Sequence, residues 1–201
     1  MTATHAPVVD VMALKTKAEA GDPAAQTRLA RAYLGGNGVK MSVKEAVKYL
    51  CLATNQNYPE ALATLGELTQ AGQGVPKNLP EAIRLYHLAA DQGSVSAQYD
   101  LAYLYEQGSG VKQDEPEAAK WYELAAEGGD PLAQYDIGQR YALGVGVAVN
   151  RVQACKWLSL AAAQGQPDSA KLLTGLKPQM SADELAQAGR LVSQFSPRAA
   201  K

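Results

Sequence analysis

The sequence predicts an all-α fold: a solenoid of four 36-residue helix-turn-helix repeats with flanking capping helices. Two observations predict it. A Gly-x-Gly-Val motif recurs four times at a constant spacing of 36 residues. Within each period, apolar and small residues recur at helical spacing in two separate stretches. Because a fixed period of roughly 20 to 50 residues is typical of stacked structural units, the spacing indicates a repeat architecture.

The Gly-x-Gly-Val motif is expected to form the turn inside each repeat. Glycine adopts positive φ without steric cost, so it can end a helix and redirect the chain. A later glycine, or Asn57 in the first repeat, is expected to end the second helix in the same way. The motifs begin at Gly36, Gly72, Gly108 and Gly144, and the later glycines are Gly93, Gly129 and Gly165.

The two helices of a repeat are clearest in the third copy. The first is expected over residues 96–107 and the second over residues 115–127. Both carry apolar or small residues on one face, as amphipathic helices do. Two sets of alanines keep the 36-residue phase: Ala46, Ala82, Ala118 and Ala154, and Ala53, Ala89, Ala125 and Ala161.

A capping box is expected at the start of every second helix. The cap side chain accepts from an orphan backbone N–H, and the acid or amide three residues later reaches back to the N–H of the cap residue. Each cap contributes about 1 kcal/mol. The four pairs are Ser42 with Glu45, Asn78 with Glu81, Asp114 with Glu117, and Asn150 with Gln153.

The period divides the chain into seven parts. We expect an N-terminal helix in residues 1–21, C-terminal capping helices in residues 166–195, and a frayed tail in residues 196–201. Another capping box, formed by Ser181 and Glu184, is expected to open the last helix. The repeats occupy residues 22–57, 58–93, 94–129 and 130–165.

Composition narrows the class of protein. A net charge of −1 argues against a nucleic-acid binder, which usually has a basic excess. Asp10, Lys15 and Lys17 interrupt any apolar stretch near the start, so we expect neither a secretory signal nor a membrane span, and a cytoplasmic protein. A processed secreted form remains the alternative.

No catalytic or cofactor-binding constellation stands out. The glycine loops follow helices and lack the Lys-Ser or Lys-Thr pair of a phosphate loop. His87 is expected at the surface rather than as a base, and no residues have metal-ligand spacing. Cys51 and Cys155 are expected to be separate free thiols that fill the core. We therefore expect no catalytic residue, no metal and no cofactor.

Residues 21–165 resemble, in register, the Sel-one-like repeat (SLR) family, a relative of tetratricopeptide repeats, and the third copy, residues 97–129, follows the family pattern with few departures. The likeness rests on the phased Ala97 and Leu101, the Gly-x-Gly-Val loop, and the pair Trp121-Tyr122. It implies a right-handed α/α superhelix that binds proteins. A cysteine-rich branch of the family is secreted and linked to β-lactam binding or hydrolysis, but the cysteine pairs of that branch are missing here.

In related arrays the first helix of each repeat lines the concave face. By register, the partner-facing positions here are Thr27, Arg31, Glu67, Gln70, Tyr99, Tyr103, Glu106, Tyr135 and Gln139. Tyr99 and Tyr135 fit partner contact and repeat packing equally well, whereas Tyr103 favours a surface role. Asp100 and Asp136 share a phase, and solvated acids are the expected state.

The leading hypothesis is a non-enzymatic adaptor or scaffold that binds a peptide or helix of a partner protein on the concave face. A monomer is the favoured state. The alternatives are a hydrolase of the β-lactam class and a self-associating structural component.

Overall fold

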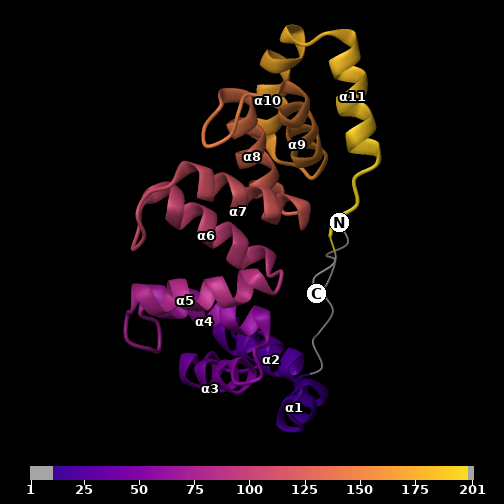
Figure 1. Ribbon diagram of the computed structural model, residues 1–201. Coiled ribbons are helices and arrows are strands. Elements are labelled where there is room, and N and C mark those ends of the chain that lie inside the picture. The colour runs from indigo at the N-terminus through magenta and orange to yellow at the C-terminus, as the bar shows by residue number, and fades with distance from the viewer. Residues whose placement is uncertain (1–10, 199–201) are drawn as a thin grey trace. The chain divides into compact units, whose positions relative to one another are not determined.

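The computed structural model describes residues 11–198, and these residues confirm the all-α class (Figure 1). They form eleven α-helices and one 3-10 helix, with no strand among them. The chain divides into two compact units, one ending at Asp91 and the other beginning at Gln92. Each unit is described by itself.

The first unit contains five helices. The N-terminal helix α1 packs on α2, and each following repeat pairs its first helix with its second, α2 with α3 and α4 with α5. The bounds are α1 Val11–Glu19, α2 Pro23–Gly35, α3 Val43–Thr54, α4 Pro59–Ala71 and α5 Leu79–Asp91.

The second unit contains the third and fourth repeats and the C-terminal helices. Helix α7 packs between α6 and α8, while α9 contacts α8, α10 and α11. The bounds are α6 Val95–Gln107, α7 Glu115–Glu127, α8 Pro131–Leu143, α9 Arg151–Ala163, α10 Pro167–Leu176, the 3-10 helix η1 Lys177–Gln179, and α11 Ala182–Ser193.

The phased alanines form the contact surface of the second helices. All eight have no exposed side-chain surface, and they come from every repeat. A methyl group leaves room for a neighbouring helix to approach closely, so these positions set how tightly the helices pack. Larger buried side chains surround them, including Leu50 in the first unit and Trp157 in the second.

The loop glycines have the predicted conformation. Gly36, Gly72, Gly108 and Gly144 have φ between 65° and 76° and cap the first helices with a backbone bond to the preceding turn. Asn57 also has positive φ, at 53°. Gly146 has a second constraint, because a Cβ added there would collide with the backbone carbonyl of Glu115.

Only half of each predicted capping box forms in the repeats. Asp114 accepts from the Glu117 N–H at 3.0 Å, and the other three caps accept in the same way. The reciprocal bond is replaced, because the N–H of Asp114 donates to the Tyr105 carbonyl across the loop. The N–H groups of Ser42, Asn78 and Asn150 donate to the equivalent carbonyl. The complete box forms at Ser181 and Glu184, as predicted.

A glutamine clamp ties neighbouring turns together in each unit. In the second unit, the Gln134 amide donates to the Ala126 carbonyl at 3.2 Å. Gln164 then donates to the Gln134 amide oxygen at 2.9 Å and to the Gly129 carbonyl at 3.1 Å. Gln26 and Gln56 form the same arrangement in the first unit. Buried side-chain amides are thus satisfied by backbone carbonyls at the helix ends.

The predicted tail and the predicted burial of the cysteines can be compared with the structure. Within the tail, the Arg198 backbone N–H donates to the Glu127 carbonyl and its guanidinium pairs with the Glu127 carboxylate at 3.2 Å. Residues 199–201 lie outside the described residues, as do residues 1–10. Cys155 is buried as expected, but the prediction that Cys51 fills the core is wrong, because Cys51 is exposed; both are free thiols. In the described residues, no helix is long and apolar enough to span a bilayer.

We predict that Gly146→Ala lowers the free energy of unfolding by about 3 kcal/mol. The substitution adds a backbone collision to the strain of positive φ, which by itself costs roughly 1–2 kcal/mol. Gly165→Ala is the matched control, since Gly165 has φ of 89° but nothing within 4 Å of its Cβ position. Urea unfolding followed by circular dichroism measures both, and equal losses would contradict the close-approach argument.

Candidate partner-binding face

The predicted face lies on the first helices of the repeats, and each unit carries part of it. In the first unit, Thr27 does not fit the prediction: it is 3% exposed, and its hydroxyl donates to the Pro23 carbonyl at 2.8 Å. The residue in phase with it in the second repeat, Ala63, is also buried. In the first unit this position therefore points into the helix packing and offers no surface to a partner.

The other predicted residues of the first unit link helices to each other. The exposed Arg31 of α2 donates to the Thr64 hydroxyl of α4 at 3.2 Å. Burial of the carboxyl raises the pKa of Glu67, and the charge of Arg31 partly opposes that rise. Gln70 accepts a hydrogen bond from the Tyr86 hydroxyl at 2.9 Å.

A buried arginine organises the face in the second unit. The Arg140 side chain of α8 is 6% exposed and pairs with Glu106 of α6 at 2.5 Å and Glu115 of α7 at 2.6 Å. Its guanidinium also lies 5.1 Å from the centre of the Tyr122 ring. Two carboxylates and an aromatic ring replace the water that a buried guanidinium loses.

Tyr122 extends this network within the third repeat. Its hydroxyl donates to the other Glu106 carboxylate oxygen at 2.9 Å, and its ring meets the Tyr99 ring edge-on at 5.5 Å. The pair Glu106 and Tyr122 stands 36 residues after Gln70 and Tyr86. The same tyrosine contact therefore occurs in both repeats, with a neutral amide in one and a carboxylate in the other.

Tyr99 connects the third repeat to the fourth. Its hydroxyl donates to the Asp136 carboxylate of α8 at 3.2 Å. Burial raises the pKa of Asp136 from its ordinary 3.8 to about 6, although the Tyr99 hydrogen bond and Arg140 both lower it. Burial and the nearby carboxylates raise the pKa of Tyr99, so its hydroxyl stays protonated and acts as the donor. The expected solvated state is therefore wrong for Asp136.

The predicted residues of the second unit differ in how much side-chain surface they leave exposed to a partner. Tyr103 is 50% exposed, and its side chain makes no hydrogen bond or ring contact with the described residues. Gln139, one repeat later in the same phase, is partly exposed. Tyr135 is also partly exposed, but it packs against the core of the fourth repeat and the C-terminal helices. Tyr99 and Glu106 are held by intramolecular contacts.

Sequence reasoning missed Arg140, Glu115 and Tyr122, yet a signal for Arg140 exists. The phase of Arg140 contains Ala32, Leu68 and Leu104, all of them buried. A cation at a position that is apolar in three other repeats predicts a buried ion pair. The period does not say which carboxylates would reach it, because they come from two other helices.

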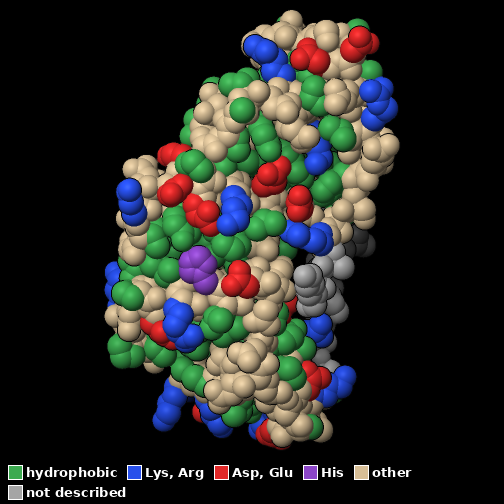
Figure 2. Space-filling view, in the orientation of Figure 1, with side chains coloured by type: hydrophobic (Ala, Val, Ile, Leu, Met, Phe, Trp, Pro, Cys, Tyr) green, Lys and Arg blue, Asp and Glu red, His purple; other side chains and the backbone are tan. Residues whose placement is uncertain are grey.

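The described residues contain no group of three metal-ligating side chains. On the face that Figure 2 shows, acidic and basic side chains are interspersed among hydrophobic ones. The arrangement in the second unit can hold two helices rigidly and present Tyr103. The charge of the buried Arg140 is compensated by Glu106 and Glu115, so the network links helices and leaves no charge there for catalysis or ligand binding.

Comparisons with known proteins agree with this architecture. The model of the Sel1 repeat family matches residues 23–58, 59–94, 95–130 and 131–166. No curated protein matches the chain. Among solved structures, a Sel1 repeat protein from Oxalobacter formigenes is 36% identical with a TM-score of 0.78, covering 83% of this chain and 48% of that one.

Two further structures are similar. A protective antigen with an SLR fold from uropathogenic Escherichia coli is 36% identical with a TM-score of 0.76, covering 92% of this chain and 41% of that one. An immunity protein from Pseudomonas aeruginosa, at 21% identity and a TM-score of 0.57, covers 92% of this chain and 70% of that one, and shares the fold. This chain spans less than half the length of the first two.

We predict that Glu106→Gln lowers the free energy of unfolding by about 2 kcal/mol. The amide can still accept from Tyr122, as Gln70 does from Tyr86, but Arg140 loses one of its two anions while remaining buried. Glu117→Gln, in an exposed pair with Lys120, is the control and should change the value by at most about 0.5 kcal/mol. Equal effects in urea unfolding would show that the buried pair has no special weight.

The raised pKa of Asp136 predicts a pH-dependent comparison with Asp136→Asn. Between about pH 4 and pH 6 the folded protein binds more protons at Asp136 than the unfolded chain, so this residue's contribution to stability falls as pH rises. From pH 4 to pH 7.5 the stability of the Asn variant relative to the original should therefore increase by about 2 kcal/mol. Urea unfolding at both pH values measures it, and a constant difference would refute the shift.

Proposed function

This chain belongs to the Sel1 repeat family. We propose that it is a non-enzymatic adaptor that binds a peptide or helix of a partner protein on the exposed side of the first helices of the repeats, called here the first-helix face. Members of this family are commonly scaffolds for protein interactions. The identity of the family therefore supports the class of function, and the exposure of particular residues supports the face.

The supporting observation is the position of Tyr103 between two fixed points. Tyr99, one turn before it on α6, is bonded to Asp136, and Glu106, one turn after it, is paired with Arg140. Both partners lie on α8, so the segment of α6 that carries Tyr103 is anchored at each side. An exposed tyrosine on a rigid base loses little conformational entropy when it binds, which is why tyrosine is common at binding hot spots.

The same phase carries Arg31, Glu67, Tyr103 and Gln139 in the four repeats. All four side chains are polar or amphipathic, and all have exposed surface. Because the residue changes within each unit, from Arg31 to Glu67 in the first and from Tyr103 to Gln139 in the second, each unit offers different side chains to a ligand. This variety supports recognition of a specific segment better than uniform packing would.

The adaptor role predicts that Tyr103→Ala weakens partner binding about tenfold or more, the loss of one hot spot. A partner is first isolated on a column of the original protein and purified, and its affinity is then measured by calorimetry. Leu132→Ala is the matched control, because Leu132 of α8 is 48% exposed, close to the 50% of Tyr103. Tyr103→Phe tests whether the hydroxyl or the ring is recognised.

One result would count against the proposal. If Tyr103→Ala and Leu132→Ala bind the purified partner as the original does, the first-helix face of the second unit is not the binding surface. If circular dichroism shows that Tyr103→Ala unfolds, Tyr103→Phe and Gln139→Ala replace it as probes of the same face.

A further inference from the structure

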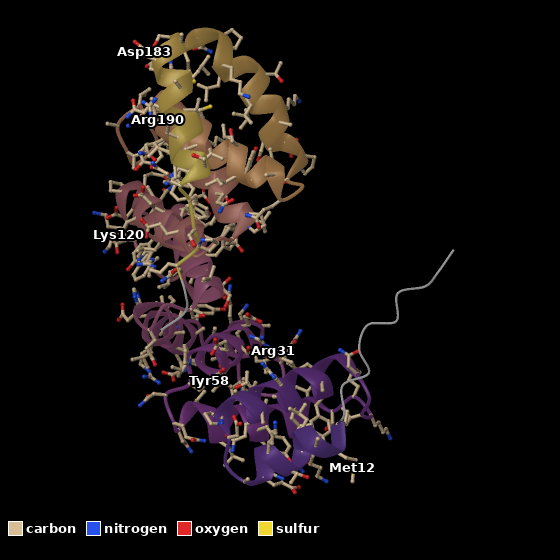
Figure 3. The ribbon with its side chains drawn as sticks, turned by 90° about the vertical axis from the view of Figure 1, so that its right-hand side faces the viewer. Met12, Arg31, Tyr58, Lys120, Asp183 and Arg190 are labelled. Carbon is tan, nitrogen blue, oxygen red and sulfur yellow. The ribbon has the colours of Figure 1, made fainter. Side chains whose placement is uncertain are left out.

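The first unit contains a groove with a basic lining. It has a volume of about 600 Å³ and runs along α1 and α2, at the N-terminal side of the first repeat. Arg31, labelled in Figure 3, belongs to its wall. The network of the second unit plays no part in this groove.

The floor of the groove is made of small side chains. Ala25 and Ala32 of α2 are almost fully buried, at 4% and 5% exposure, while Ala13 and Ala24 keep more surface. Leu14 of α1 is partly exposed and packs on the core of the unit. Alanines leave space above the helix surface, so a main chain with small side chains can lie close to it.

The charged residues of the groove are three cations and one anion. Lys17 comes from α1, and Arg28 and Arg31 come from α2. The anion, Asp22, is already used, because its carboxylate accepts the Ala25 N–H at 3.0 Å as the cap of α2. Glu67 of α4 lies near Arg31 and offsets part of its charge, and the Arg31 guanidinium already donates one of its hydrogen bonds to the Thr64 hydroxyl. An excess of positive charge remains, in a chain whose net charge is −1.

This basic character is specific to the first repeat. The position of Arg28 is Thr64, Asp100 and Asp136 in the later repeats, and that of Arg31 is Glu67, Tyr103 and Gln139. Packing of the repeat therefore does not require a cation at either position. The two arginines add charge complementarity to this one groove.

We propose that the groove binds an extended acidic segment of a partner protein, with carboxylates at alternate residues and small aliphatic side chains between them. Arg28 and Arg31 are three residues apart, roughly 4.5 Å along the helix axis. Alternate side chains of an extended chain lie about 6.6 Å apart on one side, a difference that two flexible arginines can span. The planar guanidinium binds carboxylates through two parallel hydrogen bonds.

The proposal rests on the adaptor function and specifies the charge and conformation of one segment of the partner protein. It is tested with two dye-labelled synthetic peptides of about twelve residues, one alternating Glu with Ala and one alternating Lys with Ala. Fluorescence anisotropy with the full chain measures binding at low and at high salt. The acidic peptide should bind, the basic one should not, and salt should weaken binding by screening.

The variants are Arg28→Ala with Arg31→Ala, and the charge reversal Arg28→Glu with Arg31→Glu. The first should weaken binding of the acidic peptide at least tenfold, and the second should abolish it and create binding of the basic peptide. The matched control is Lys44→Ala with Lys77→Ala, which removes two exposed charges of the same unit outside the groove and should leave binding unchanged. Circular dichroism checks that each variant is folded.

Several results would overturn the proposal. They are no binding of the acidic peptide, equal loss in the lysine control, or no switch of preference on charge reversal. If light scattering shows that the protein is a dimer, that the arginine variants are monomers, and no peptide binds, the groove would be assigned to a second copy of the chain instead. If peptide binding fails while Tyr103→Ala still weakens a purified partner, the groove proposal fails and the adaptor function stands.

Discussion

The close contact of helices at the phased alanines is the constraint on which the rest of the structure depends. These alanines are fully buried in all four repeats, and a larger side chain would push the paired helices apart. The glycines with positive φ and the single-sided caps then set where each helix ends. With helix spacing and helix ends determined, the two first helices within each unit come close enough for side chains to bond across them.

The bonds between first helices differ in the two units. In the first unit the link from α2 to α4 is a hydrogen bond from Arg31 to Thr64. In the second unit it is a charged network centred on Arg140, together with the bond from Tyr99 to Asp136. Buried charges hold their partners in one geometry because any other arrangement leaves an unpaired charge in a poor solvent. The residues on either side of Tyr103 are therefore held by partners on α8, while Arg28 and Arg31 of the first unit are exposed to a ligand.

This difference relates the two proposals to each other. Rigidity supports recognition by Tyr103, since an ordered aromatic anchor loses little entropy on binding. Accessible arginines support recognition of carboxylates, since long flexible side chains can adjust to a ligand. A repeat fold permits both, because surface positions vary between copies while the buried alanines stay the same.

The period, the helices, the turn glycines and the buried alanines could all be predicted from the sequence. Each depends on local conformation or on a residue that recurs every 36 positions, and both can be recognised in the sequence without knowing how the helices pack. The face of the first helices could be predicted as a set of positions, but the state of each side chain could not.

Tertiary structure alone decided those states. Thr27 is buried by the packing of its helix, and Asp136 is shielded and bonded to Tyr99. The N–H groups of the cap residues donate to carbonyls across the loop instead of to the acid or amide three residues later. The carboxylates that pair with Arg140 come from two other helices. The groove beside Arg28 forms where α1 packs on α2. The sequence by itself determined the repeat, its helices and its turns, because these depend on residues close together in the chain and on their recurrence every 36 positions. Which charges find each other depends on distances between helices, and only the packed structure sets those distances.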